Sequence, residues 1–239
     1  AFNIVKALLL AAGLGSRLRP ITDKIPKCLV PIKGKPLLEY WLEILQAQNI
    51  EEIIINTHYL SQQVDEFINH SKVANELQQE NKLKIVYEPT LLGTAATIRE
   101  NYLFLKNSKL LLIHADNWCR CNFTDFITYH NSERPTNTTM TMMTFETSKP
   151  SQCGIVELGQ RGIVTHFHEK IENPPSNLAN GAIYILEPEI IEWINQKIEV
   201  TDISRELLPK FINKIATWKN NNIHKDIGTI EMLELAQND

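Results

Sequence analysis

Residues 8–27 have the sequence LLLAAGLGSRLRPITDKIPK, and the fold can be inferred from this stretch outward. Its first part belongs to an apolar run, Lys6–Ala12, which predicts a fully buried strand. The strand leads directly into a loop with Gly13 and Gly15, where glycines allow positive φ and let backbone N–H groups point at an oxyanion. Prolines further along indicate a stiff extended loop instead of the start of a helix. The stretch therefore predicts a buried strand that ends at an anion-binding loop.

The rest of the first half alternates apolar runs with amphipathic segments. Further strands are expected over Glu52–Asn56, Leu83–Tyr87 and Lys109–His114. Helices are expected over Pro36–Gln48, after a cap at Ser61, and over Thr94–Leu105. Continuous apolar strands separated by helices predict an α/β fold, with a doubly wound, mainly parallel (Rossmann-like) mixed sheet flanked by helices. Ligands of such sheets bind outside the carboxyl ends of the strands.

The pattern changes after about Thr138. The strands expected there are Thr138–Phe145, Gly154–Leu158, Gly162–His168 and Ala179–Leu186. Helices are expected over Glu189–Gln196, over Asp202–Phe211 and after Gly228. These segments indicate a small inserted β lobe within a single domain that covers residues 1–239, with a first part over about 1–137 and a second over about 138–239.

Charge is unevenly distributed along the 239 residues. The 24 Lys and Arg residues stand against 28 Asp and Glu residues, and the net charge of −4 argues against a broadly basic nucleic-acid binder. Between Gly13 and Pro36, however, six basic residues face Asp23 alone, a local net charge of +5. This segment suggests a local anion site, and a solvated basic face is the alternative.

Cysteine content and hydropathy point to a cytoplasmic protein. Four cysteines are too few for a disulfide framework in a chain of this length, and Cys119 and Cys121 do not have the C-x-x-C spacing of zinc knuckles. The longest apolar run, Ala7–Ala12, is too short to span a bilayer, so we expect no membrane partner.

Two common phosphate-binding motifs do not match the glycine loop. The dinucleotide fingerprint requires a third glycine where this chain has Leu18, which disfavours a nicotinamide-dependent oxidoreductase. A P-loop requires Ser or Thr after Gly34-Lys35, and Pro36 stands there instead.

The run Gly13-Leu-Gly-Ser-Arg-Leu-x-Pro-x-Thr22, followed by Pro26-Lys27, resembles the signature of the sugar-1-phosphate nucleotidylyltransferases. The resemblance continues in Leu92–Ala95, Phe167–Lys170 and Lys225–Thr229. It implies a reaction in which a nucleoside triphosphate and a sugar 1-phosphate give a nucleotide-diphospho-sugar and pyrophosphate. The first part of the chain would then bind the nucleotide and the second the sugar.

The resemblance also implies roles for individual residues. Arg17, Lys27 and Asp116 are expected to be catalytic, with Asp116 and Asp226 holding Mg²⁺, a hard cation that suits carboxylates together with substrate phosphates. The expected nucleotide-binding residues are Leu10, Ala11, Ala12, Gly13, Gly15, Gly93 and Thr94. The expected sugar-phosphate-binding residues are Glu169, Lys170 and Asn180.

Leu92–Ala95 favours guanylyl- or uridylyl-transferring members, and we expect GTP with a hexose or heptose 1-phosphate. Two alternatives stay open: a catalytically silent nucleotide-sugar-binding module, and a uridylyl- or cytidylyl-transferring relative. The sequence ends ten residues after Thr229, so we expect transferase chemistry alone, and nothing in it indicates an oligomeric state.

Overall fold

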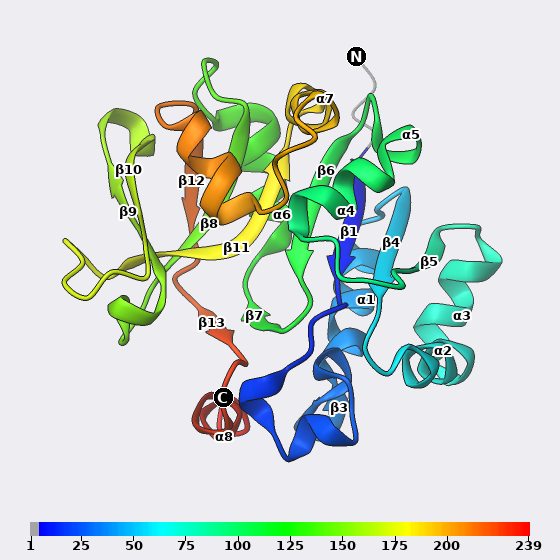
Figure 1. Cartoon of the computed structure of the whole chain (residues 1–239). Helices are drawn as coiled ribbons and strands as arrows, with labels where there is room; N and C mark the ends of the chain where they lie inside the picture. The colour runs from blue at the N-terminus through cyan, green and yellow to red at the C-terminus, as the bar shows by residue number, and fades with distance from the viewer. Residues whose placement is uncertain (1–4) are drawn as a thin grey trace. The chain divides into compact units, whose positions relative to one another are not determined.

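The computed structural model describes residues 5–239, which form two compact units (Figure 1). The first unit contains residues 5–91, 113–120 and 223–239, and the second contains Leu92–Leu112 and Cys121–Asn222. The chain therefore passes between the units more than once. None of the helices in the described part of the chain is long and apolar enough to cross a membrane.

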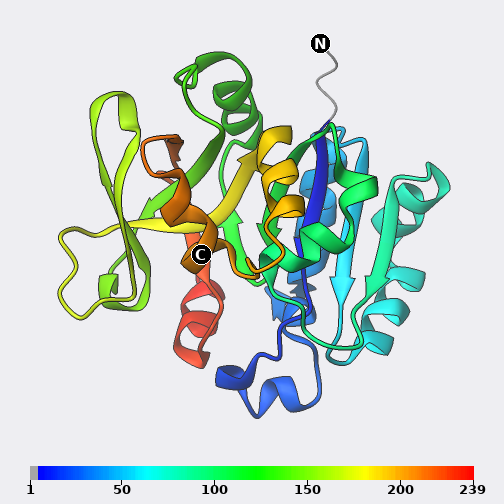
Figure 2. The ribbon, with the colours of Figure 1, turned by 45° about the horizontal axis from the view of Figure 1, so that its top comes forward.

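Parallel strands form the centre of the first unit. Strands β1 (Val5–Leu10), β4 (Glu52–Thr57) and β5 (Leu83–Tyr87) lie side by side in that order (Figure 2). Their middle residues are apolar and those of β1 and β4 are fully buried, as expected for strands covered on both faces. The helices of this part are α1 (Leu37–Ala47), α2 (Ser61–His70) and α3 (Lys72–Gln79).

Two short antiparallel pairs complete the first unit. Strands β2 (Pro31–Ile32) and β3 (Lys35–Pro36) form a tight hairpin. Strands β7 (Asn117–Arg120) and β13 (Ile223–Asp226) pair over their full lengths, although they lie about a hundred positions apart in the sequence. The final helix, α8 (Ile230–Ala236), follows β13.

The second unit is mainly antiparallel. Strand β8 (Met140–Glu146) pairs with antiparallel β11 (Leu178–Leu186) and with parallel β12 (Ile215–Lys219). Strand β9 (Gly154–Leu158) pairs with β10 (Val164–Glu169) and touches β11. Its helices are α4 (Thr94–Glu100), α5 (Tyr102–Leu105), α6 (Phe123–Thr128) and α7 (Pro188–Gln196). Strand β6 (Lys109–His114) has residues in both units.

The expected α/β class with a mixed sheet flanked by helices is confirmed. Three local expectations are wrong. Ser61 is the first residue of α2 and not its cap; Leu60 occupies the cap position with φ 51°, and its apolar side chain accepts no hydrogen bond from the helix. The helix expected over Thr94–Leu105 is interrupted at Asn101. Residues Ile203–Leu207 form a π turn, and Leu208–Phe211 form a 3₁₀ turn with Pro209 in its first turn, in place of one continuous α-helix.

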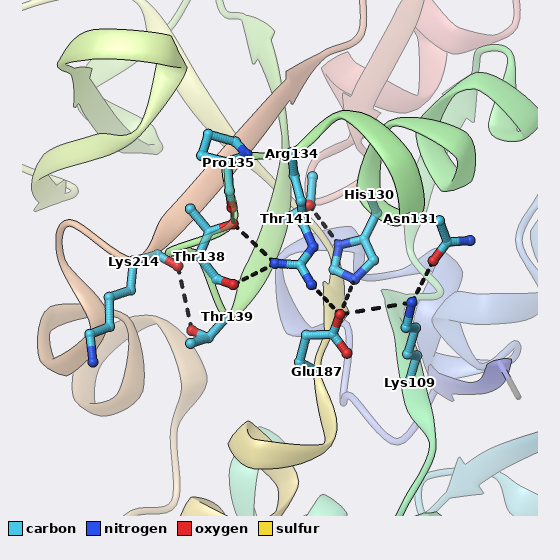
Figure 3. A network of polar contacts seen from close by, with 10 residues as sticks. All are labelled: Lys109, His130, Asn131, Arg134, Pro135, Thr138, Thr139, Thr141, Glu187 and Lys214. Atoms are coloured by element: carbon cyan, nitrogen blue, oxygen red, sulfur yellow. Dashed lines mark hydrogen bonds and ion pairs between the residues drawn. The ribbon is translucent and has the colours of Figure 1, made fainter. Parts of the chain in front are cut away.

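A polar network around Glu187 stabilises the second unit (Figure 3). The Glu187 carboxylate accepts a hydrogen bond from Arg134, and its Oε1 lies 3.8 Å from Lys109 Nζ and 3.3 Å from His130 Nε2. On its other side, the His130 ring lies 2.7 Å from the Thr141 hydroxyl. The Glu187 side chain is only 13% exposed. Its contacts link the end of β11 to the start of β6, through Lys109, and to the segment after α6, through His130 and Arg134.

Candidate active site

Four charged side chains from distant parts of the sequence gather in the first unit. They are Arg17, Lys27, Asp116 and Asp226, and we call them the charged cluster. Lys27 Nζ donates to Asp116 Oδ2 and lies 3.7 Å from Asp226 Oδ1. The Lys27 side chain is 14% exposed, whereas that of Asp226 is 57% exposed, so the cluster has a buried cation and an open carboxylate.

The backbone explains how the two aspartates meet. Asp116 follows β6 at the start of the β7 segment, and Asp226 is the last residue of β13. In the β7–β13 pair, Asp226 stands opposite Asn117, and the Ile227 N–H donates to the Asp116 carbonyl at 3.1 Å. The antiparallel pairing therefore brings together two carboxylates that are 110 positions apart.

The two cations come from the basic segment that follows β1. Lys27 opens a 3₁₀ turn immediately after Pro26. Arg17 lies in the first 3₁₀ turn of this segment, Ser16–Leu18. Its guanidinium lies beside the backbone of Gly228, since a Cβ on that glycine would lie 2.8 Å from Arg17 Nη2. The segment thus contains three short 3₁₀ turns where a stiff extended loop was expected.

Electrostatics couple the members of the cluster. Burial opposes the charged form of Lys27, but the charges of Asp116 and Asp226 outweigh it and raise the pKa of Lys27. Burial also opposes ionisation of Asp116, yet the Lys27 ammonium lowers the pKa of Asp116 overall. Loss of solvation and the neighbouring Asp116 charge raise the pKa of Asp226. The cluster therefore holds a protonated Lys27 and an ionised Asp116. A further cation nearby would stabilise the ionised form of Asp226.

The glycine loop begins where β1 ends. Leu10 is the last residue of β1, and the N–H of the next residue, Ala11, donates to Asn56 Oδ1 at 2.7 Å. Gly15 has φ 63° and ψ 31°, as expected for a glycine that must adopt positive φ. Gly13, by contrast, does not have positive φ. It is exposed, and a Cβ there would meet nothing within 4 Å.

Ala11 and Ala12 are 8% and 6% exposed, and their side chains are single methyl groups. The expected contacts of Leu10, Ala11 and Ala12 with a base would therefore use backbone groups and short apolar side chains.

Gly93 and Thr94 lie in the second unit, at the start of α4. Gly93 has φ 102°, and a Cβ there would lie 2.6 Å from the Thr201 carbonyl oxygen. That oxygen accepts a hydrogen bond from the Ala95 N–H at 2.9 Å, and the Thr94 hydroxyl accepts one from the Ile203 N–H at 2.8 Å. The glycine is needed at this position because the segment around Thr201 packs directly on the helix start.

Glu169 and Lys170 lie at the end of β10. β10 ends at Glu169, one residue beyond the expected strand Gly162–His168, and Lys170 follows it with φ 51°. The Lys170 ammonium lies 3.9 Å from Glu169 Oε1 and the lysine side chain is 54% exposed. Burial, followed by the nearby Asp202 charge, raises the pKa of Glu169, whereas Lys170 and Arg205 oppose that shift.

Asn180 belongs to the same unit and sits at an irregularity of β11. Its Nδ2 donates to the Tyr184 hydroxyl at 2.6 Å, and its Oδ1 accepts from the Ala182 N–H at 2.8 Å. The register with β8 shifts between Asn180 and Tyr184, and Ala182 has φ 54°. This bulge fixes the orientation of the Asn180 amide.

Sequence reasoning missed several polar residues at these places. Asp202 and Arg205 act electrostatically on Glu169, and no motif pointed to them. Asn56, 3% exposed, holds the Ala11 N–H and donates in turn to Glu88 Oε2 at 3.1 Å. A polar residue at the end of the apolar run Glu52–Asn56 was the available signal for Asn56.

The charged cluster has donors that suit a hard divalent cation. Among residues 5–239, no group of three or more His, Cys, Asp and Glu side chains forms a ready metal site. Asp116 and Asp226 nevertheless lie close enough for the charge of one to raise the pKa of the other. Two carboxylates in that position fit Mg²⁺, which prefers one or two carboxylates plus substrate phosphates and water.

Comparison with known proteins shows to which family this chain belongs. The profile described as "Nucleotidyl transferase" matches residues 6–239. The chain belongs to the nucleotidyl transferase family. The mannose-1-phosphate guanylyltransferase of Mycobacterium tuberculosis is 28% identical, with 97% of this chain and 63% of that protein covered. The UTP–glucose-1-phosphate uridylyltransferase of Synechocystis is 28% identical, with 87% of this chain and 55% of that protein covered.

This chain therefore spans less than two thirds of the length of these two relatives. Among solved structures, HddC from Yersinia pseudotuberculosis complexed with GMP-PN is 25% identical with a TM-score of 0.78, and 98% of both chains is covered. The resemblance noted in the sequence is thus confirmed as family membership.

Proposed function

We propose that this nucleotidyltransferase joins a nucleoside triphosphate to a sugar 1-phosphate, giving a nucleotide-diphospho-sugar and pyrophosphate. One observation carries the proposal: the charged cluster brings together two cations from the segment after β1 and two carboxylates from the β7–β13 pair. These residues are Arg17, Lys27, Asp116 and Asp226. A site for two phosphate-bearing substrates needs concentrated positive charge, and phosphoryl transfer depends mostly on positioning and charge stabilisation.

In this reaction an oxygen of the sugar phosphate attacks the α-phosphorus in line, and the bond to the departing pyrophosphate breaks. Lys27, kept protonated by its raised pKa, would hold the α-phosphate. Arg17 is exposed and would bind the triphosphate and the leaving pyrophosphate through its bidentate guanidinium. No covalent intermediate on the protein is required, so the chain needs no nucleophile.

Asp116 and Asp226 would hold Mg²⁺. When bound, the ion would neutralise and orient the phosphates. The meeting of the two residues at the β7–β13 pair and the 57% exposure of the Asp226 side chain support this assignment, because Mg²⁺ prefers one or two carboxylates plus substrate phosphates and water.

In the second unit, Lys170 would bind the sugar phosphate, and Glu169 and Asn180 would bind sugar hydroxyls. The exposed ammonium of Lys170 and the fixed amide of Asn180 support these roles. Residues 10–15 of the first unit would bind the nucleotide. Gly93 and Thr94 of the second unit are also assigned to nucleotide binding. The nucleotide-binding part would cover about residues 1–137 and the sugar-binding part about 138–239, in a cytoplasmic protein whose four cysteines are free thiols.

GTP with a hexose or heptose 1-phosphate is the substrate pair that we propose. The guanylyltransferase of M. tuberculosis and the GMP-PN complex of HddC support guanine. A uridylyl-transferring activity is the second candidate, because the Synechocystis uridylyltransferase is equally identical to this chain.

A substrate matrix tests the proposal. Four nucleoside triphosphates are each combined with a panel of sugar 1-phosphates and Mg²⁺, and pyrophosphate release is measured. We expect release with GTP and a hexose or heptose 1-phosphate. Nucleotide binding without pyrophosphate release from any pair would instead identify a catalytically silent module.

A further inference from the structure

The carboxylate of Asp239, beyond the end of α8, bonds to two strands at once. Its oxygens accept from Lys225 Nζ at 2.8 and 2.7 Å, and Oδ2 also accepts from Trp118 Nε1 at 2.9 Å. The side chains of Asp239 and Lys225 are 18% and 22% exposed, so this bidentate ion pair is largely shielded from water. None of the roles described above uses these contacts.

The two partners of Asp239 stand next to the aspartates of the charged cluster. Trp118 lies two positions after Asp116, and Lys225 lies immediately before Asp226. Lys225 and Trp118 are also direct cross-strand partners in the β7–β13 pair, and Asp226 forms the adjacent pair with Asn117. The Asp239 carboxylate therefore bonds to both residues of the Lys225–Trp118 pair, which is adjacent to the pair that contains Asp226.

Apolar packing places α8 against the same backbone. Leu233 and Ala236 of α8 belong to one buried group with Leu18, Trp118 and Ile227. Leu18 adjoins Arg17, and Ile227 adjoins Asp226, so the buried face of α8 supports the chain beside members of the cluster. The Asp239 contacts add direction to this packing, because the ion pair with Lys225 positions β13 and the hydrogen bond from Trp118 positions β7.

We propose that Asp239 is a positioning residue that holds Asp116 and Asp226 at the separation a divalent cation requires. This inference rests on the proposed function, in which the two carboxylates bind Mg²⁺. Residues that orient metal ligands through hydrogen bonds typically change metal affinity by about 10–100-fold when they are removed. Asp239 acts through Lys225 and Trp118, not on the ligands themselves, so the lower end of that range applies.

The test compares Asp239→Ala with Gln237→Ala. Gln237 also lies just after α8 and also makes two anchoring contacts, with the Pro31 carbonyl at 2.8 Å and the Lys33 N–H at 2.7 Å, but it touches neither β7 nor β13. Mn²⁺ serves as the probe in place of Mg²⁺, and its binding in the presence of GTP is measured by titration calorimetry and by electron paramagnetic resonance. Thermal unfolding of each variant, and the Mg²⁺ concentration that half-saturates pyrophosphate release, are measured in parallel.

We expect both variants to lower the unfolding temperature, and only Asp239→Ala to weaken Mn²⁺ binding, by about tenfold. The Mg²⁺ half-saturation should rise by a similar factor. Asp239→Asn, which keeps an acceptor for Trp118, should retain the fold and show a smaller effect, about threefold. Equal Mn²⁺ affinity in Asp239→Ala, Asp239→Asn and Gln237→Ala would overturn the proposal, as would a wild-type chain that binds no Mn²⁺.

The two hypotheses fail in different ways. A wild-type chain that binds Mn²⁺ but releases no pyrophosphate from any substrate pair contradicts the proposed function, and the Mn²⁺ affinities of the variants still decide the role of Asp239. A wild-type chain that is active, with variants that all bind Mn²⁺ equally, contradicts the role of Asp239 alone.

Discussion

Replacing Glu187 by Gln should destabilise the chain by removing the only carboxylate of the network in Figure 3. The substitution keeps the shape of the side chain but leaves Arg134 and Lys109 without their anion. Burial alone would favour the neutral acid, but the hydrogen bond from His130 and the two cations outweigh it and lower the pKa of Glu187.

The expected magnitude follows from the geometry. At the 3.8 Å that separates Lys109 Nζ from Glu187 Oε1, one ion pair is worth about 4 kcal/mol at an effective dielectric constant near 20. Desolvation offsets part of this, and breaking a buried pair by removing one partner costs about 3–5 kcal/mol. Because Glu187 keeps 13% exposure, we expect a loss of about 3 kcal/mol.

Urea unfolding at pH 7 measures this loss, with Glu146→Gln as the control. Glu146 forms an ion pair with Lys219, but both side chains are well exposed, at 61% and 43%, and its loss should cost at most about 0.5 kcal/mol. A carboxylate with a lowered pKa stabilises the fold above its unfolded value, near 4.5, so the difference between wild type and Glu187→Gln should shrink as the pH falls below that value. Equal losses in the two variants, or a difference that is independent of pH, would refute this reasoning.

Two further substitutions test contacts of the second unit. Gly93→Ala combines a φ of 102° with a Cβ 2.6 Å from the Thr201 carbonyl and should cost about 3 kcal/mol in urea unfolding, whereas Gly34→Ala, with φ 79° and open space, should cost only about 1 kcal/mol. Similar losses for both glycines would show that packing on Thr201 is unimportant. Arg99 donates to the carbonyls of Ile194, Lys197 and Val200 at 2.9, 2.6 and 2.5 Å, so Arg99→Met should cost about 2 kcal/mol and speed hydrogen exchange after α7. Unchanged exchange in that segment would contradict the anchoring role.

Hydrophobic patterning was sufficient to predict the strands that are buried on both faces. β5, β6 and β9 have the expected bounds, and β4 ends one residue later than expected. The apolar runs of β4 and β6 are continuous and bounded by polar residues, which makes their ends clear in the sequence. Strands β7, β12 and β13 were missed. β7 and β13 have only four residues each, and their pairing depends on a partner far away in the sequence, which no local pattern reports.

In the site, too, local patterns identified individual residues but not the contacts between distant parts of the chain. Motifs identified Arg17, Lys27, Asp116 and Asp226, and the structure brings them into one cluster. Motifs could not indicate that Lys27 bridges both carboxylates, nor that Asn56 holds the backbone of Ala11, because these contacts arise from the packing of separate elements. The geometry of Lys170 was also unpredictable, since no local pattern indicates its positive φ immediately after β10.

The most direct test of the charged cluster is pyrophosphate release by Lys27→Ala and Asp116→Asn, with GTP, mannose 1-phosphate and Mg²⁺. If Lys27 holds the α-phosphate and Asp116 binds the metal, each substitution should slow turnover at least about a hundredfold, the usual effect of removing one charge partner of the transition state. Circular dichroism would confirm that both variants are folded. Turnover close to that of the wild type in both variants would contradict the assignment of the cluster as the site of nucleotidyl transfer.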